Sequence, residues 1–182
     1  MTSRLHYGRT AKVFHWLIVA ILLVQYPLGW LMPDVRRGEV PGMATNAHIS
    51  IGIVVMGLIV LRLAWRLTHP VAPESNLPPW QRLSSEAVHW LLYLAVFLTA
   101  ITGWIYASMR GWALSFFVLF PLPPLVAPGS PMGRQLGELH GSLIYVLIGL
   151  ICLHVLAALV HMFVYRDGVM RRMLPGNCLR TM

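Results

Sequence analysis

Residues 139–165 read LHGSLIYVLIGLICLHVLAALVHMFVY, and this stretch decides the fold class because it is apolar along its length and contains no Asp, Glu, Lys or Arg. A helix needs about 20 mostly apolar residues to cross the roughly 30 Å hydrocarbon core of a bilayer. Three other stretches meet or approach that length, at 13–33, 46–66 and 87–108. A single spanning segment can satisfy its backbone hydrogen bonds only as a helix. The sequence therefore predicts an all-α, integral membrane four-helix bundle.

The composition excludes a soluble globular protein. Of the 182 residues, 57% are hydrophobic and 11% are charged, whereas soluble domains carry about 25% charged residues. The formal net charge is +8, which in a polar protein would indicate nucleic acid binding. Here the basic residues lie between apolar runs, which indicates a bilayer and no nucleic acid partner. We expect residues 1–182 to form a single transmembrane domain.

The Lys and Arg residues divide unequally between the two sides of the predicted bundle. One side, which includes both termini and the second loop, holds ten: Arg4, Arg9, Lys12, Arg62, Arg66, Arg82, Arg166, Arg171, Arg172 and Arg180. The other side holds only Arg36, Arg37, Arg110 and Arg134. Because basic residues are enriched on the cytoplasmic side of membrane proteins, we expect both the N-terminus and the C-terminus to be cytoplasmic.

The connection at 112–128 is apolar enough to enter a bilayer, but it contains four prolines. Proline removes a backbone donor and clashes with the preceding helical turn. The stretch before Pro121 is then too short to span a bilayer as a helix. We predict an interfacial segment or a segment that caps the bundle.

Histidines are the most informative polar residues of this chain. Ionisable groups inside a membrane are costly, so each is a candidate functional residue. One histidine alone could simply form a hydrogen bond to a neighbouring helix, but six of the eight lie within or at the ends of the predicted spans. These six are His15, His48, His89, His140, His154 and His161.

The spacing of these histidines predicts two pairs. His140 and His154 are 14 residues apart, so they lie about 40° apart around a helix axis and about 21 Å apart along it. The helix at 13–33 carries His15 near its start, and the antiparallel helix at 46–66 carries His48 near its start. Depth in the membrane therefore matches His48 with His140 and His15 with His154.

Two imidazoles at each level, without a carboxylate or thiolate, favour a six-coordinate b-type haem. Zinc would require about four ligands at one level, and a di-iron centre would require glutamates inside the bundle. His161 follows His154 by seven residues and lies on nearly the same face, so spacing alone also allows His15 to pair with His161. His89, at the expected start of the third helix, is interpreted as an interfacial or supporting histidine.

Several motifs make the sequence similar to the bacterial cytochrome b561 family, which is related to the cytochrome b subunits of nickel-iron hydrogenases. The similarity covers almost the whole chain, and each motif contains or precedes one of the histidines. The motifs are Phe14-His15-Trp16, Asn46-Ala47-His48-Ile49-Ser50-Ile51-Gly52, Val88-His89-Trp90-Leu91-Leu92-Tyr93, Glu138-Leu139-His140-Gly141, Gly149-Leu150-Ile151-Cys152-Leu153-His154 and Ala158-Leu159-Val160-His161.

The resemblance implies a multi-pass protein of the bacterial inner membrane with two haem b groups. It implies His48 and His140 as axial ligands of a periplasmic haem, and His15 and His154 as ligands of a cytoplasmic one. Members of similar length include a superoxide oxidase, an oxidoreductase that passes electrons from periplasmic superoxide to ubiquinone. By the same resemblance, His161 matches a position beside the quinone.

Two functional hypotheses follow from this resemblance. In the first, the chain is a superoxide:ubiquinone oxidoreductase, and basic residues on the periplasmic side attract the superoxide anion. These residues are Arg36, Arg37, Arg110 and Arg134. In the alternative, the chain is a cytochrome b subunit that relays electrons between the quinone pool and a partner hydrogenase, dehydrogenase or periplasmic cytochrome. Residues with a catalytic role beyond these are not identified by the sequence.

Overall fold

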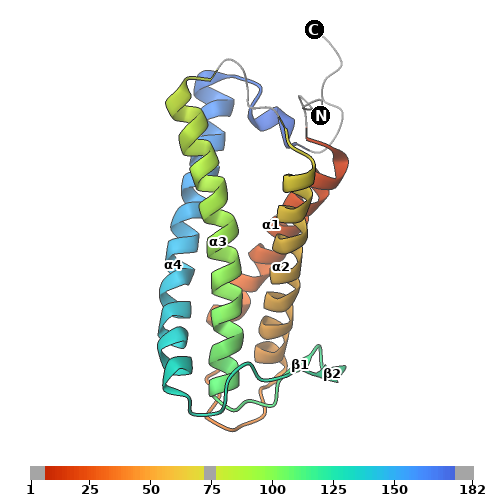
Figure 1. The fold of residues 1–182 in the computed structure, drawn as a ribbon, viewed down its shortest axis with the longest axis vertical. Coiled ribbons are helices and arrows are strands. Elements are labelled where there is room, and N and C mark those ends of the chain that lie inside the picture. The colour runs from red at the N-terminus through yellow and green to blue at the C-terminus, as the bar shows by residue number, and fades with distance from the viewer. Residues whose placement is uncertain (1–6, 72–76, 175–182) are drawn as a thin grey trace.

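The computed structural model describes residues 7–71 and 77–174, and this part of the chain contains four long helices (Figure 1). They are α1 (Arg9–Leu31), α2 (Met43–Thr68), α3 (Pro79–Met109) and α4 (Pro131–Val160). Successive helices run in opposite directions along one long axis (Figure 1). Each is long and apolar enough to cross a membrane. The predicted all-α membrane bundle is confirmed.

All four helices begin earlier than the hydropathy pattern indicated, and the difference is largest, about two turns, for α3 and α4. α3 begins at Pro79 rather than near residue 87, and α4 begins at Pro131 rather than near residue 139. Proline suits the first helical position because its fixed φ and missing N–H cost nothing there. The polar first turns continue each helix beyond the part that hydropathy detects. The placement of His89 at the start of a helix was therefore wrong: it lies about three turns inside α3.

The helices pack in chain order, α1 on α2, α2 on α3 and α3 on α4. Among the described residues, α4 has no comparably extensive backbone contact with α1 or α2. Buried side chains fill the middle of the bundle, and they include Ile18 of α1, Val55 and Ile59 of α2, Tyr93 of α3 and Leu147 of α4. The histidines of α4 therefore face α1 and α2 across side chains and not across a tight helix contact.

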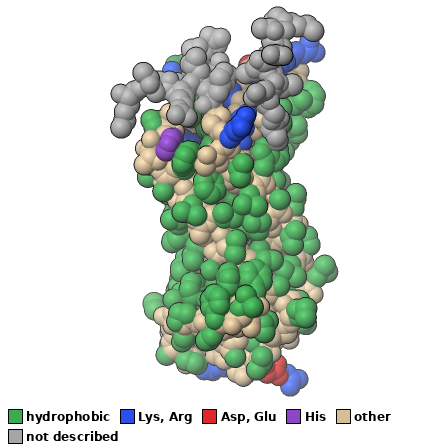
Figure 2. Space-filling view, turned by 90° about the vertical axis from the view of Figure 1, so that its right-hand side faces the viewer, with side chains coloured by type: hydrophobic (Ala, Val, Ile, Leu, Met, Phe, Trp, Pro, Cys, Tyr) green, Lys and Arg blue, Asp and Glu red, His purple; other side chains and the backbone are tan. Residues whose placement is uncertain are grey.

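The surface of the bundle matches a lipid environment. Figure 2 shows apolar side chains over the middle of the molecule, and the charged side chains visible on this face lie at its two ends. Large apolar residues on the helices are strongly exposed, as in Leu23, Tyr145 and Leu156. Such continuous apolar exposure is rare in soluble monomers and is expected where a helix contacts acyl chains.

The apolar connection after α3 forms a short antiparallel hairpin of β1 (Ser115–Phe116) and β2 (Phe120–Pro121). As its prolines predict, it forms no fifth spanning helix. Hydrogen bonds attach it to α2: Asn46 Nδ2 donates to Ser115 Oγ at 2.6 Å, and the backbone N–H of Phe117 donates to Ser50 Oγ at 2.8 Å. We refer to residues 114–122 as the hairpin, and to this end of the bundle as the hairpin end.

At the opposite end, α4 continues into a π-helical turn, η1 (His161–Tyr165), and then a short 3₁₀ turn, η2 (Met170–Arg172). The segment after η1 folds onto the start of α1. Trp16 Nε1 donates to the carbonyl of Met173 at 2.9 Å, and Lys12 Nζ donates to the carbonyl of Leu174 at 2.8 Å. The start of α1 and the end of α4 therefore lie at the same end of the bundle (Figure 1).

Candidate functional site

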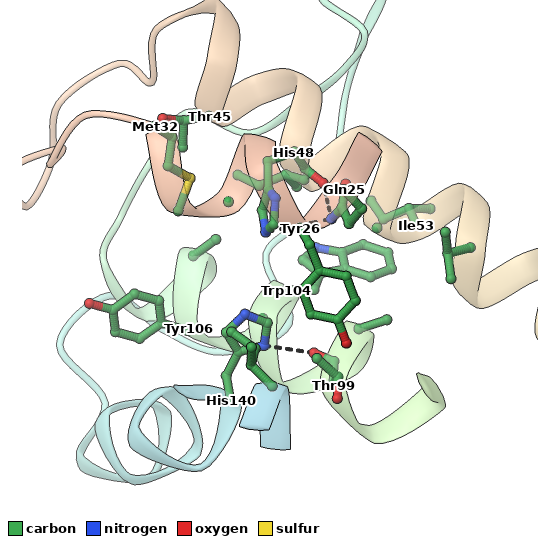
Figure 3. Close-up of a pocket in the computed structure, with 18 of the residues that line it drawn as sticks. Gln25, Tyr26, Met32, Thr45, His48, Ile53, Thr99, Trp104, Tyr106 and His140 are labelled. Carbon is green, nitrogen blue, oxygen red and sulfur yellow. Dashed lines mark hydrogen bonds between the residues drawn. The ribbon is translucent and has the colours of Figure 1, made fainter. Parts of the chain in front are cut away.

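A cavity of about 210 Å³ lies at the hairpin end, between residues of all four long helices described above. His48 of α2 and His140 of α4 both line it, and most other lining side chains are apolar. Figure 3 shows the two imidazoles pointing toward one another from opposite walls, with Tyr26 and Trp104 beside them. The structure thus brings together the two histidines that matching depth paired.

The ring of His140 is held in a defined state. Its Nδ1 lies 2.7 Å from the carbonyl oxygen of Thr99, as the dashed line in Figure 3 marks. Because a carbonyl oxygen can only accept, Nδ1 carries the proton and Nε2 keeps its lone pair. Metal-binding histidines are commonly oriented in this way by a backbone carbonyl. The ring of His140 therefore keeps a lone pair on Nε2, which is the state that a metal-binding imidazole requires.

Gln25 of α1 contacts His48 in a different way. The side-chain Nε2 of Gln25 donates to the backbone carbonyl of His48 at 2.9 Å. The same Gln25 atom lies 3.5 Å from the ring Nε2 of His48. In the described part of the chain, His48 Nδ1, Gln25 Oε1, Tyr26 OH and Thr45 Oγ1 are buried without a hydrogen-bond partner. Buried polar atoms are nearly always paired, and all four residues line the cavity. This wall fits a bound group with polar atoms at its edge.

Each of these two imidazoles lies against a glycine of a neighbouring helix. A Cβ added to Gly29 of α1 would lie 2.7 Å from Cε1 of His48, and one added to Gly103 of α3 would lie 2.8 Å from Cε1 of His140. Contacts this short would force either ring to move. Glycine at these positions therefore permits the observed ring positions.

A second group of histidines lies toward the other end of the bundle, where His15 of α1, His89 of α3 and His154 of α4 meet. The ring centroids of His15 and His154 are 6.2 Å apart, and those of His89 and His154 are 5.2 Å apart. When two imidazoles bind on opposite sides of one metal ion, each through a metal–nitrogen bond of about 2 Å, their ring centroids lie about 6 Å apart. The pair His15 and His154 meets this separation, and Nδ1 of His15 is buried without a partner among the described residues.

Two basic residues of α2 near this cluster each lie over one aromatic ring of α3. The guanidinium of Arg62 lies 5.5 Å from the ring centre of Tyr93, and that of Arg66 lies 5.8 Å from the ring centre of Trp90.

Within the described ranges, no three His, Cys, Asp or Glu side chains are arranged to hold a bare metal ion. Pairs of imidazoles beside apolar surfaces instead fit the two axial positions of a haem.

His161 has a different partner. Its Nδ1 lies 2.6 Å from Oδ2 of Asp167, and Oδ1 of Asp167 accepts the backbone N–H of Val169 at 3.0 Å. Of the two histidines of this helix that could pair with His15, His154 lies beside the ring of His15. His161 instead contacts Asp167 in the segment after η1.

The four arginines predicted to steer an anion all lie at the hairpin end. Arg36 and Arg37 are exposed, and Arg134 forms an exposed ion pair with Glu138 at 3.3 Å. Arg110 is half-buried: its guanidinium lies over the rings of Tyr106 and Trp112 and donates to the carbonyl of Val35. Of the basic residues counted on the other side, Arg4 and Arg180 lie outside the described residues.

Sequence reasoning missed several residues that shape the sites. Gln25 carried a signal, because it is a lone amide within the apolar stretch 13–33. Thr99 carried none, because it acts through its backbone carbonyl. The position of His89 beside His154 depended on where α3 begins.

The fold and the site together define a class of protein: a multi-pass α-helical membrane protein with histidine pairs placed between its helices. The family model described as prokaryotic cytochrome b561 matches residues 6–176, and the chain belongs to this family. It is therefore a multi-pass protein of the bacterial inner membrane with a role in electron transfer, and the family implies haem b.

Named relatives agree with this assignment. The chain is 32% identical to cytochrome b561 homolog 2 of Escherichia coli over 170 residues, which cover 92% of this chain and 90% of that protein. It is 28% identical to the "Probable superoxide oxidase CybB" of Yersinia pestis, over 88% of this chain and 91% of that protein. It is 25% identical to cytochrome b562 of Cereibacter sphaeroides, over 96% of this chain and 98% of that protein.

Proposed function

We propose that this chain is a di-haem cytochrome b that moves electrons across the inner membrane from periplasmic superoxide to ubiquinone. The observation that carries the proposal is the placement of two imidazole pairs toward opposite ends of the bundle, His48 with His140 and His15 with His154. Both pairs join α4 to helices that it does not closely pack against. Such spacing suits a flat group inserted between helices.

The chain's own side chains would hold and orient the cofactors. When bound, a haem b exchanges single electrons through its iron. His140 would be fixed for ligation by its bond to Thr99, and the ring of His48 would be placed by its close contact with Gly29. The apolar cavity would exclude water from this centre, and the protein would set its redox properties through ligation and dielectric.

The hairpin end carries four arginines against three carboxylates, Asp34, Glu39 and Glu138, and this small excess of positive charge supports an anionic donor. Arg36, Arg37, Arg110 and Arg134 all lie at this end, which the excess of basic residues on the opposite side assigns to the periplasm. In the net reaction, two superoxide anions lose one electron each and become two molecules of oxygen. One ubiquinone gains these two electrons and two protons and becomes ubiquinol.

For the acceptor side, we assign His161 as a quinone contact by analogy with the family. Its half-buried ring is held by Asp167 at the end of the last spanning helix. Because Nδ1 faces the carboxylate, Nε2 is the remaining ring nitrogen, and it donates a hydrogen bond to a quinone carbonyl only when the imidazole carries both protons.

The test is a single optical experiment on detergent-purified protein. We expect a reduced-minus-oxidised spectrum of b type with two haems per chain, reduction by a pulse of superoxide, and reoxidation on addition of ubiquinone. Two haems that do not respond to superoxide would contradict the proposed donor and favour the relay subunit, whose partner should then co-purify. Protein without haem would contradict the ligand assignment.

Charge removal tests the steering role of the exposed arginines. We expect the triple substitution Arg36→Gln, Arg37→Gln and Arg134→Gln to lower the second-order rate of reduction by superoxide about threefold or more at low salt, because attraction of an anion raises its association rate. The rate should also depend less on ionic strength. Arg110 stays unchanged because its guanidinium is bonded within the fold.

A matched control removes three exposed charges from the opposite end: Arg9→Gln, Arg82→Gln and Arg171→Gln. This variant should keep the original rate and salt dependence. An equal loss in both triple variants would indicate a general effect of net charge and would contradict steering at the hairpin end.

A further inference from the structure

We propose that the hairpin, residues 114–122, is a lipid anchor whose apolar tip inserts among the headgroups and first acyl carbons of the membrane leaflet at the hairpin end. The occupant of this exposed surface is thus phospholipid. The inference depends on the membrane location of the protein but not on the identity of its electron donor.

Composition gives the first argument. No Asp, Glu, Lys or Arg occurs between Arg110 and Arg134, and the hairpin contains the unbroken apolar run FFVLFPL at 116–122. At the tip, the exposed fractions are 75% for Val118 and 77% for Leu119. An exposed apolar patch of this kind marks a surface that contacts another apolar phase.

The depth of the hairpin gives the second argument. α2 has 26 residues, so it is about 39 Å long and exceeds the roughly 30 Å hydrocarbon core. The hairpin is attached at Ser50, about 10 Å along α2 from its first residue. With α2 centred in the bilayer, about 4.5 Å of the helix extends beyond each side of the core, so this attachment lies about 6 Å inside the hydrocarbon core, at the level of the first acyl carbons. Figure 1 shows that the hairpin projects sideways from the bundle beside the end of α2.

The backbone of the tip gives the third argument. Phe117 and Val118 have φ values of +47° and +63°, a left-handed conformation that is unusual for bulky and β-branched residues. It is held by two hydrogen bonds: the N–H of Leu119 donates to the carbonyl of Phe116 at 2.9 Å, and the N–H of Phe117 donates to Ser50. Such strained conformations persist where the surroundings fix them, often at functional positions. Here the tight turn presents consecutive apolar side chains at the tip.

Two tryptophans connect this region to the rest of the hairpin end. Trp104 Nε1 donates to the carbonyl of Pro123 at 3.2 Å, and Trp112 Nε1 donates to the carbonyl of Arg36 at 3.0 Å. Tryptophan is enriched at membrane interfaces, where its ring is apolar and its N–H meets polar groups.

Phospholipid is favoured over a protein partner because the hairpin continues the apolar surface of the spans. In Figure 2 the lower part of the visible face is mostly apolar up to the charged end. The anchor would also act on the site: Asn46 and Ser50, which hold the hairpin, lie two residues before and after His48.

Depth-dependent quenching tests this inference. In a Cys152→Ser, Cys178→Ser background, Leu119→Cys is labelled with an environment-sensitive fluorophore, and the purified protein is placed in nanodiscs at one copy per disc. We expect blue-shifted emission, with quenching at least twofold stronger by lipid carrying a doxyl group near the headgroup than by lipid carrying it near the chain end. The control, Glu39→Cys in the α1–α2 connection at the same end, should show water-like emission and little quenching.

Water-like emission from the label at position 119, with quenching no greater than at position 39, would overturn the proposal. So would a blue shift that appears only when several copies share a disc, because the tip would then contact protein. The optical spectrum of each labelled variant reports whether the fold and the bound cofactors are intact. The fluorescence result does not involve superoxide or quinone, so its failure is distinguishable from failure of the proposed function.

Discussion

Protein in which His140 is replaced by alanine is expected to contain one haem b per chain, whereas the proposed function gives two for the unmodified chain. The imidazole of His140 is oriented by the carbonyl of Thr99 and faces His48 across the cavity at the hairpin end. Alanine leaves no donor on α4 at this level, so one axial position of that haem would be lost. The pair of His15 and His154 lies toward the other end and should keep its haem.

The measurement is haem per chain, from the pyridine haemochrome spectrum and the protein concentration. The matched control is His69→Ala, which removes a histidine stacked on Trp65 with 3.8 Å between the ring centres, outside both pairs. This control should retain two haems. Two haems in the His140→Ala protein would show that this residue is not a required ligand.

The second large effect concerns the other pair. Replacing His154 by alanine should also halve the haem content, whereas His89→Ala should leave it at two per chain. His89 and His154 lie in one cluster with His15. The ring centres of His15 and His154 are 6.2 Å apart, a separation that fits two ligands of one ion. Those of His89 and His154 are 5.2 Å apart, which is too close for that arrangement. Haem content and the low-temperature electron paramagnetic resonance spectrum, which is sensitive to axial ligands, report the result.

The same comparison decides between the pairings that spacing left open. His15→Ala should lose one haem, and His161→Ala should keep both but slow reoxidation by ubiquinone. Retention of both haems in His15→Ala, with loss of one in His89→Ala, would reassign the ligand to α3. Loss of one haem in His161→Ala would restore the alternative pairing of His15 with His161.

The fold was predictable because its cause is visible in the sequence. An apolar stretch that is long enough to span a bilayer must be a helix there. Residues 139–165 form such a stretch and contain no Asp, Glu, Lys or Arg. The ends of the helices were less predictable. Hydropathy detects only the part of a helix that contacts lipid, so it missed the first turns of α3 after Pro79 and misplaced His89.

Pairing in the candidate site was predictable from depth and helical period, because residues that share a helix have fixed relative positions. Contacts between residues of different helices were not predictable from the sequence. Gly29 meets His48, and Gly103 meets His140, because of how α1 packs on α2 and α3 on α4. Likewise, the prolines of the 112–128 connection excluded a helix but did not indicate strand pairing between Ser115 and Pro121.

Both predicted pairs use one continuous helix, α4, which runs from Pro131 to Val160 without a break. Insertion or deletion of a single residue between His140 and His154 would rotate one of them by about 100° away from the face they share. Homologous genes should therefore vary in the identity of the intervening residues while their number stays at thirteen. Length changes should instead accumulate in the connections between helices, where a change in residue number leaves the relative rotation of the two histidines unaltered.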